Sequence, residues 1–254
     1  MRTLAQPDWC ILDLDPKDAP FEQVITLALA ARSLCERLEL PHFIKTSGSS
    51  GLHVLVPLAR QLDHAGAISF GQVLAEALVQ QHPDIATTER VVRARRSKVY
   101  VDYLQNGRGK LLVAPFAARP RPGVPVSMPL RWEEVGPRLH PRKFTALDAA
   151  ARMERLGSDP FLGVLGEAPD LVSVLSRLQT YLQERGQLNR PVGGPTRTGR
   201  WGGPRTPKRL SPQGDAGEPA QESRSPRLSS SGAPPASPAG GAHPAAPRGP
   251  RRRR

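Results

Sequence analysis

The chain has 254 residues and a formal net charge of +13, which is enough for one sizeable domain with its own core. Residues 190–254 hold thirteen Lys and Arg against three Asp and Glu, a net of +10, so most of the basic charge belongs to the C-terminal tail. Two cysteines exclude a disulfide framework, and no apolar run reaches the roughly 18–20 residues that cross a bilayer. We therefore expect a soluble, cytoplasmic protein with no membrane contact.

The first predicted element is a strand, Cys10–Asp15, which ends on two carboxylates. Because side chains alternate faces along a strand, Asp13 and Asp15 point one way while Leu12 and Leu14 point the other. Two like charges on one face repel each other, and a cation between them would relieve that repulsion. These residues alone leave two interpretations open: a metal site, or an exposed acidic turn that leads into a helix.

Helices and strands alternate after this strand, which predicts an α/β sandwich of a sheet and helices. The first helix carries an apolar stripe from Val24 to Leu38, and Asp18 is its expected N-cap. The other expected elements are strands at 42–47, 52–58 and 99–104, helices at 65–81 and 171–185, helical turns at 132–134 and 141–147, and a loop at 159–163.

The pair Asn106-Gly107 is a strong hairpin signal, so residues 110–116 are predicted to return as a strand. Residues 117–129 are rich in Pro and Arg and are expected to form an ordered loop.

Bulky apolar residues almost vanish in the last part of the chain, so residues 187–254 are predicted to be disordered and residues 7–186 to form the folded domain. The terminal run of four arginines fits a contact with nucleic acid, and a solubilising tail is the equal alternative.

Asp102 is a third notable carboxylate because it interrupts an apolar strand. An acid is costly to bury without a partner, and a divalent metal shared with Asp13 and Asp15 would satisfy all three. Two metal ions on carboxylates form the usual clamp for phosphoryl transfer to a hydroxyl. The alternative is a salt bridge from this acid to one of three nearby cations, Arg95, Arg96 or Lys98.

A turn of small residues, Ser47–Gly51, lies between two expected strands and is followed by His53. Such a turn leaves backbone N–H groups free to face an anion, and His53 can donate to a phosphate oxygen, although a single histidine is more often structural. Lys45 could stand on either face of its strand. Cations around Asp102 suit a triphosphate, with a solvated basic face as the alternative: Arg93, Arg95, Arg96, Lys98, Arg108, Lys110, Arg119 and Arg121.

Several motifs in consistent order resemble the polymerase domain of bacterial DNA ligase D, in the archaeo-eukaryotic primase superfamily. The resemblance extends over about residues 7–185. The first three motifs are Leu-Asp-Leu-Asp-Pro at 12–16, Lys-Thr-Ser-Gly at 45–48 and Gly-Leu-His-Val at 51–54. The later ones are Val-Asp-Tyr-Leu-Gln-Asn at 101–106, Arg-Pro-Arg-Pro-Gly at 119–123 and Pro-Val-Ser-Met-Pro-Leu at 125–130. The resemblance implies a primase-type α/β (α+β) catalytic lobe with a mixed, RRM-like sheet packed by helices.

The resemblance also implies roles for single residues. The ligands of Mn²⁺ or Mg²⁺ would be Asp13, Asp15 and Asp102. The nucleotide would contact Ser47, His53, Gln105 and Arg119, with Arg95 as a partial substitute for a phosphate-binding lysine of the family. The implied activity is template-directed nucleotidyl transfer by a two-metal mechanism in non-homologous end joining. DNA ends, NTP or dNTP, a Ku-like protein and an ATP-dependent DNA ligase would be its partners.

Two departures from the family pattern support other readings. Ser49 and Ser50 stand where the family turn commonly reads Gly-Lys, and the chain starts at the Asp-Leu-Asp strand, so that an N-terminal lobe is expected to be missing. No Lys-x-Asp-Gly adenylation motif follows residue 186. The alternatives are a catalytically impaired remnant that binds nucleic acid or a partner, and a phosphatase or nuclease built on the same acids.

Overall fold

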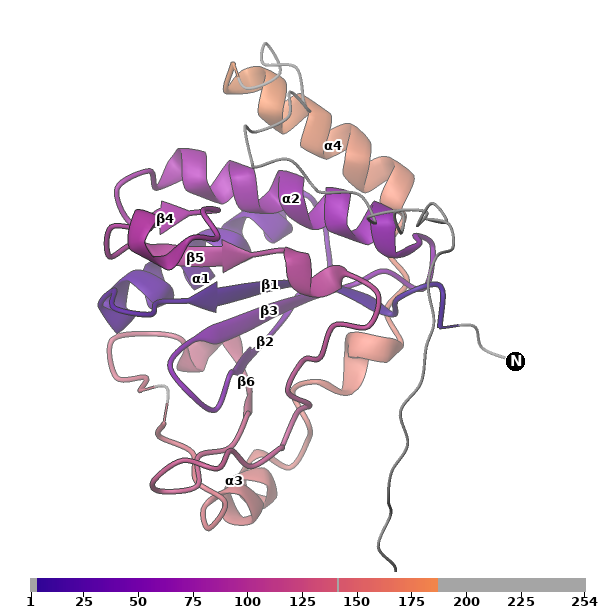
Figure 1. Ribbon diagram of the computed structural model, residues 1–254. Helices are drawn as coiled ribbons and strands as arrows, with labels where there is room; N and C mark the ends of the chain where they lie inside the picture. The colour runs from indigo at the N-terminus through magenta and orange to yellow at the C-terminus, as the bar shows by residue number, and fades with distance from the viewer. Residues whose placement is uncertain (1–3, 141, 187–254) are drawn as a thin grey trace, which may run out of the picture. The chain divides into compact units, whose positions relative to one another are not determined.

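The computed structural model describes residues 4–140 and 142–186, and a six-stranded mixed sheet lies at its centre (Figure 1). The strand order is β4-β5-β1-β3-β2-β6, in which β4 and β5 are parallel and all other neighbours antiparallel. The strands are β1 (Trp9–Asp15), β2 (Phe43–Thr46), β3 (Leu52–Pro57), β4 (Ala86–Thr87), β5 (Val99–Asp102) and β6 (Pro129–Leu130).

Two long helices, α1 (Phe21–Arg37) and α2 (His64–Gln81), pack on one face of the sheet. Period-2 alternation sends Leu12 and Leu14 of β1 into the core that these helices share. A later helix, α4 (Leu171–Glu184), adds its own apolar side to the same core. The opposite face of β1 carries Trp9, Ile11, Asp13 and Asp15, of which Ile11 lies in a small second apolar cluster and Trp9 packs against it. The sheet therefore has one apolar face and one face that turns polar towards the end of β1.

The prediction that Asp18 caps α1 is wrong. Asp18 is exposed, and the helix begins after Pro20, which makes no side-chain capping bond. Ala19 donates to the Pro16 carbonyl instead, so a tight turn comes before the helix, and the fixed φ of proline suits its entry. The α2 helix does have a side-chain cap, since Asp63 accepts from the backbone N–H of Gly66 at 2.7 Å.

The expected hairpin at Asn106-Gly107 is also wrong. β5 ends at Asp102, Asn106 lies in a 3-10 helix (Leu104–Asn106), and residues 110–116 contain no strand. The buried Asn106 carboxamide accepts from the Ile11 N–H at 2.8 Å and donates to the Ile11 carbonyl at 2.9 Å. The Asn106 side chain thereby makes the hydrogen bonds to Ile11 that a continuation of β5 beside β1 would have made.

The last third of the chain is less regular than its first part. The predicted turn at 132–134 is confirmed as a 3-10 helix (Trp132–Glu134), and the predicted last helix is confirmed as α4. Residues 142–147 are not helical, and Thr145 instead bridges Pro125. The sequence did not predict β4, β6, the helix α3 (Ala149–Leu156), or the 3-10 helices Val92–Ala94 and Leu162–Leu165.

The predicted disordered tail, residues 187–254, lies outside the described residues. Within the described ranges, none of the helices combines the length and the hydropathy needed to cross a membrane.

Candidate active site

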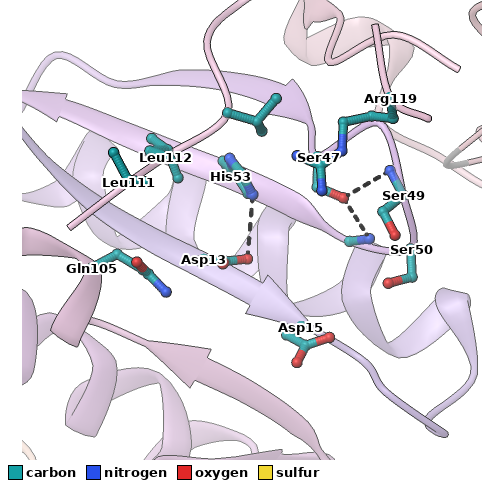
Figure 2. A pocket seen from close by; sticks show the side chains of 12 residues that line it. Asp13, Asp15, Ser47, Ser49, Ser50, His53, Gln105, Leu111, Leu112 and Arg119 are labelled. Atoms are coloured by element: carbon teal, nitrogen blue, oxygen red, sulfur yellow. Dashed lines mark hydrogen bonds and ion pairs between the residues drawn. The ribbon is translucent and has the colours of Figure 1, made fainter. Parts of the chain in front are cut away.

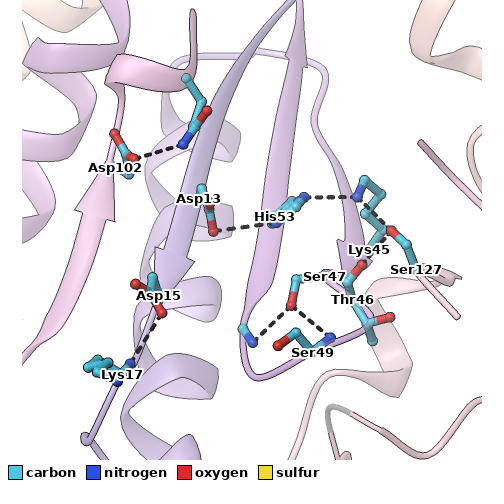
Figure 3. Close-up of polar contacts among 12 residues, drawn as sticks. Asp13, Asp15, Lys17, Lys45, Thr46, Ser47, Ser49, His53, Asp102 and Ser127 are labelled. Carbon is cyan, nitrogen blue, oxygen red and sulfur yellow. Dashed lines mark hydrogen bonds and ion pairs between the residues drawn. The ribbon is translucent and has the colours of Figure 1, made fainter. Parts of the chain in front are cut away.

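One row of side chains crosses four strands on the polar face of the sheet (Figure 3). In the strand register Asp13 of β1 is opposite Asp102 of β5 on one side and opposite His53 of β3 on the other. His53 is in turn opposite Lys45 of β2. Directly opposite residues on paired strands place their side chains on the same face. The order across the sheet is therefore Asp102, Asp13, His53, Lys45.

A pocket opens over this row (Figure 2). Six of the eight residues predicted for the site line it: Asp13, Asp15, Ser47, His53, Gln105 and Arg119. Asp102 and Arg95 are not among the lining residues, although both are bonded to residues that are. The turn residues 49–51 and an apolar ledge, Leu111–Val113, complete the wall. The structure thus gathers residues from β1, β3, two turns and a loop around one opening.

Asp13 is the most perturbed acid of the row. Burial is the main reason why its pKa is raised to about 7, and the neighbouring charges of Asp102 and Asp15 raise it further. Among the described residues its carboxylate contacts one basic side chain, His53, whose Nε2 lies 3.4 Å from Oδ1. The ionised form of Asp13 is therefore disfavoured near neutral pH, and a cation at this position would favour it.

Asp15 has a direct cationic partner. Its Oδ2 lies 3.2 Å from Nη1 of Arg95, and its Oδ1 accepts from the backbone N–H of Lys17 at 3.2 Å. The Arg95 guanidinium stacks over the Tyr100 ring at 4.0 Å and also donates to the backbone carbonyls of residues 89 and 90. Arg95 is thus held as a clamp on Asp15 and does not project into the pocket.

Asp102 is satisfied by hydrogen bonds. It accepts from the Tyr100 hydroxyl at 3.2 Å, the Leu104 N–H at 2.8 Å and Gln105 Nε2 at 3.1 Å. No salt bridge to Asp102 is found in the described residues, and Arg95 pairs with Asp15 instead. Across residues 4–140 and 142–186 no three His, Cys, Asp or Glu side chains form a ready-made metal cage. To bind a cation, Asp15 and Asp102 would have to replace some of their present hydrogen-bond donors with the metal ion.

The Ser47–Gly51 turn is braced by its own first residue. Ser47 Oγ accepts from the N–H groups of Ser49 at 3.2 Å and Gly51 at 3.0 Å. The prediction that the N–H groups of this turn are free to face an anion is therefore wrong for these two. Glycine is required at residue 51, because a Cβ there would lie 2.2 Å from the Leu14 carbonyl oxygen. Gly48 has a φ of +66°, and a Cβ on it would meet Arg119 at 2.8 Å. The turn therefore packs tightly between β1 and the segment that carries Arg119.

Arg119 lines the pocket on the side of the Ser47–Gly51 turn. Its Nε is buried and has no hydrogen-bond partner among the described residues. A buried donor without a partner costs roughly 1–3 kcal/mol. Figure 2 shows this side chain above Ser47, on the same side of the pocket as the turn.

Comparison with known proteins identifies the family. A family model described as the LigD primase-polymerase domain matches residues 1–161. The chain belongs to this family. It is 32% identical over 179 residues to the multifunctional non-homologous end joining protein LigD of Pseudomonas aeruginosa, covering 70% of this chain and 21% of that protein. It is 29% identical over 178 residues to the bifunctional LigD of Bacillus subtilis, covering 68% and 29%.

A solved LigD structure shares the fold. The polymerase domain of Mycobacterium tuberculosis ligase D in complex with DNA matches with a TM-score of 0.59 and 31% identity, over 65% of this chain and 57% of that one. The expected primase-type α/β lobe with a mixed sheet is thereby confirmed. The chain spans less than a third of the length of the two LigD proteins and 57% of the solved polymerase-domain chain.

Two residues of this LigD domain were missed by sequence reasoning. Lys45 is fully buried beside His53, and Ser127 is fully buried beside Lys45. Alternation along β2 provides a signal for the first, because Ile44 enters the core and Lys45 must then share the face of His53. Ser127 carries no such signal, since it lies in a segment that was expected to be a loop.

Burial also sets the charges of this pair. It lowers the pKa of Lys45 to about 7, with nearby Arg119 lowering it further and Asp13 opposing the change. Burial, followed by the charges of Lys45 and Arg119, holds the pKa of His53 well below its usual value. His53 is therefore a neutral imidazole at physiological pH.

Proposed function

We propose that this domain adds nucleotides to a primer 3′-hydroxyl at DNA ends, directed by a template and with two divalent ions, Mg²⁺ or Mn²⁺. The observation that carries the proposal is a single pocket in which Asp13 and Asp15 face Ser47, His53 and Arg119. An acidic edge for metals beside a basic edge for phosphates is what transfer from a triphosphate requires. Family membership and the end-joining names of the relatives support the same activity.

The metal ions would be held by Asp13, Asp15 and Asp102. The raised pKa of Asp13 fits this role, because three neighbouring carboxylates in a partly buried site favour a shared cation over three separate charges. Bound divalent ions would lower the pKa of the primer hydroxyl and neutralise charge on the reacting phosphate. Gln105, now bonded to Asp102, would hold that carboxylate in place at the edge of the nucleotide site.

The chain's own residues would bind the triphosphate. Arg119 brings a guanidinium with a buried, unpartnered Nε, and a guanidinium grips phosphate through charge-assisted hydrogen bonds. His53 faces the same opening as a neutral donor, and the Ser47 hydroxyl braces the turn beside it. Arg95, which now holds Asp15, would supply further positive charge at the acidic edge.

The partners follow from the same proposal. The solved LigD relative was determined with DNA, and template–primer DNA ends are the proposed macromolecular substrate here, with NTP or dNTP as the second. A Ku-like end-binding protein and an ATP-dependent ligase are the proposed partners in the cytoplasm. Residues 7–186 would be the catalytic unit, and residues 187–254 a separate basic tail.

Primer extension on a short 5′-phosphorylated gap with Mn²⁺ tests the activity. We expect incorporation by the wild type and loss of it in Asp13→Ala, with DNA binding retained in both. DNA binding without incorporation by the wild type would favour the alternative, a nucleic-acid- or partner-binding module. The Ser49-Ser50 pair and the donors that occupy Asp15 and Asp102 favour that alternative. Strand degradation in the same assay would indicate a hydrolase.

A further inference from the structure

Lys45 is an unusual residue for the interior of a sheet face. Its side chain is fully buried, at 0% exposure, and its Nζ ends between two polar atoms from other elements. Nζ lies 2.8 Å from His53 Nδ1 and 2.7 Å from Ser127 Oγ. Burying an amine at the end of a long side chain is costly unless each contact is a good hydrogen bond, so these two contacts determine what the lysine does.

The direction of each hydrogen bond can be assigned from the donors available. The Ser127 hydroxyl donates its proton to the Thr46 carbonyl at 2.9 Å, so towards Lys45 it can only accept. In its charged form the lysine amine has three N–H groups and no lone pair, so it donates to both Ser127 and His53. His53 Nδ1 then accepts, and the ring proton of the neutral imidazole must lie on Nε2.

The other side of the ring leads to the same assignment. His53 Nε2 faces Oδ1 of Asp13 at 3.4 Å and opens into the pocket. An ionised carboxylate has no proton to donate, so with Asp13 in the charged form that a bound cation favours, a proton on Nε2 suits this contact and a bare nitrogen would repel it. Lys45 and Asp13 therefore favour the same tautomer from opposite sides of the imidazole ring.

We propose that Lys45 is a positioning residue that, held by Ser127, fixes the tautomer of His53 so that its Nε2–H is directed into the pocket. The inference rests on the proposed function for what the pocket binds, because the Nε2–H would donate to a phosphate oxygen of the nucleotide. Lys45 itself is sealed away from the ligand and acts only through the ring. Its effect is to keep the Nε2–H donor in a fixed orientation at the phosphate-binding side of the pocket.

Nitrogen NMR of histidine-labelled protein tests the tautomer directly. Long-range proton–nitrogen correlations separate a protonated ring nitrogen from an unprotonated one, and a His53→Gln spectrum identifies the signal among the six histidines. We expect wild-type His53 to be in the Nε2–H form, and Lys45→Met to shift it towards the other tautomer or a mixture. Ser127→Ala should give a smaller shift in the same direction. Lys98→Met is the matched control, because Lys98 bonds the Pro83 carbonyl outside the row.

Nucleotide kinetics give the second readout. Lys45→Met should raise the nucleotide KM about tenfold with kcat little changed, which corresponds to about 1.4 kcal/mol of lost binding. An Nδ1–H tautomer in the wild type would overturn the inference. A His53 signal that is unchanged in a folded Lys45→Met variant would overturn it too, even if the enzyme is active. Absence of incorporation by the wild type with the Nε2–H form intact would instead reject the proposed function and leave the tautomer assignment standing.

Discussion

The two faces of the central sheet are made by the same strands but carry opposite kinds of residue. On the helix-covered face, Leu12 and Leu14 of β1 are almost fully buried in the main core. On the other face, Asp13 and Lys45 are buried at a cost, since burial raises the pKa of the acid and lowers that of the lysine, each to about 7. The first face stabilises the fold, whereas the second holds polar groups that destabilise it until a ligand arrives.

The largest effect on stability is expected on the apolar face. Leu14→Ala should lower the free energy of unfolding by about 2–5 kcal/mol, because Leu14 is fully buried between the sheet and the helices. Urea denaturation followed by circular dichroism measures the change. Val172→Ala is the control, since Val172 on α4 is 80% exposed and should change stability little. Equal effects of the two substitutions would contradict the assignment of the core.

A substitution next to Leu14 on the opposite face should have the opposite sign. The pKa of Asp13 is raised from 3.8 to about 7, so its stabilising contribution is complete below about pH 4 and is lost as pH rises through 7. Asp13→Asn should therefore be more stable than the wild type at pH 8, by on the order of a few kcal/mol, and should lose that advantage towards pH 4. Denaturation in EDTA at both pH values checks this. A constant difference across pH would show that Asp13 does not titrate as described.

A smaller loss is expected at the junction of the two faces. Asn106→Ala would leave the N–H and C=O of Ile11 without their carboxamide partner, at a cost of about 1–3 kcal/mol. Amide hydrogen exchange should accelerate most at Ile11 and less at Leu55, which faces β1 from the other side. An unchanged exchange rate at the Ile11 amide would contradict the two hydrogen bonds between Asn106 and Ile11.

The smallest change in stability is expected at the phosphate edge. Arg119→Gln should not lower the free energy of unfolding, because it removes a buried Nε that has no partner in the described structure. The same variant should weaken nucleotide binding about tenfold. A filter-binding or calorimetric titration measures the second effect. A stability loss as large as that of Leu14→Ala would place Arg119 in the fold and not in the site.

The elements that the sequence predicts well are those with a long or strict apolar period. The stripe of α1, the alternation of β1 and the amphipathic α4 each follow from their own residues, and the structure confirms them. Asn106-Gly107 misled because its local turn preference is outweighed by a buried contact with Ile11, 95 residues earlier. The two-residue strands β4 and β6 have no period to detect, since they exist only through their neighbours.

The candidate site was predictable to the extent that it lies on regular strands. The common face of Asp13 and Asp15 follows from alternation alone, and the structure confirms it. That Asp102 stands opposite Asp13, and Lys45 opposite His53, depends on strand register, which no local pattern determines. The clamp of Arg95 on Asp15 likewise needs a contact across 80 residues.

Metal-dependent nucleotide binding tests the comparison of the two faces most directly. A nucleoside triphosphate titrated calorimetrically into the wild type with Mn²⁺ should bind, and the binding should weaken strongly in EDTA or in Asp13→Asn, although that variant is the more stable protein at pH 8. Equal binding by wild type and Asp13→Asn, or binding that does not depend on the metal, would contradict the view that this acidic face is kept for a cation and a nucleotide.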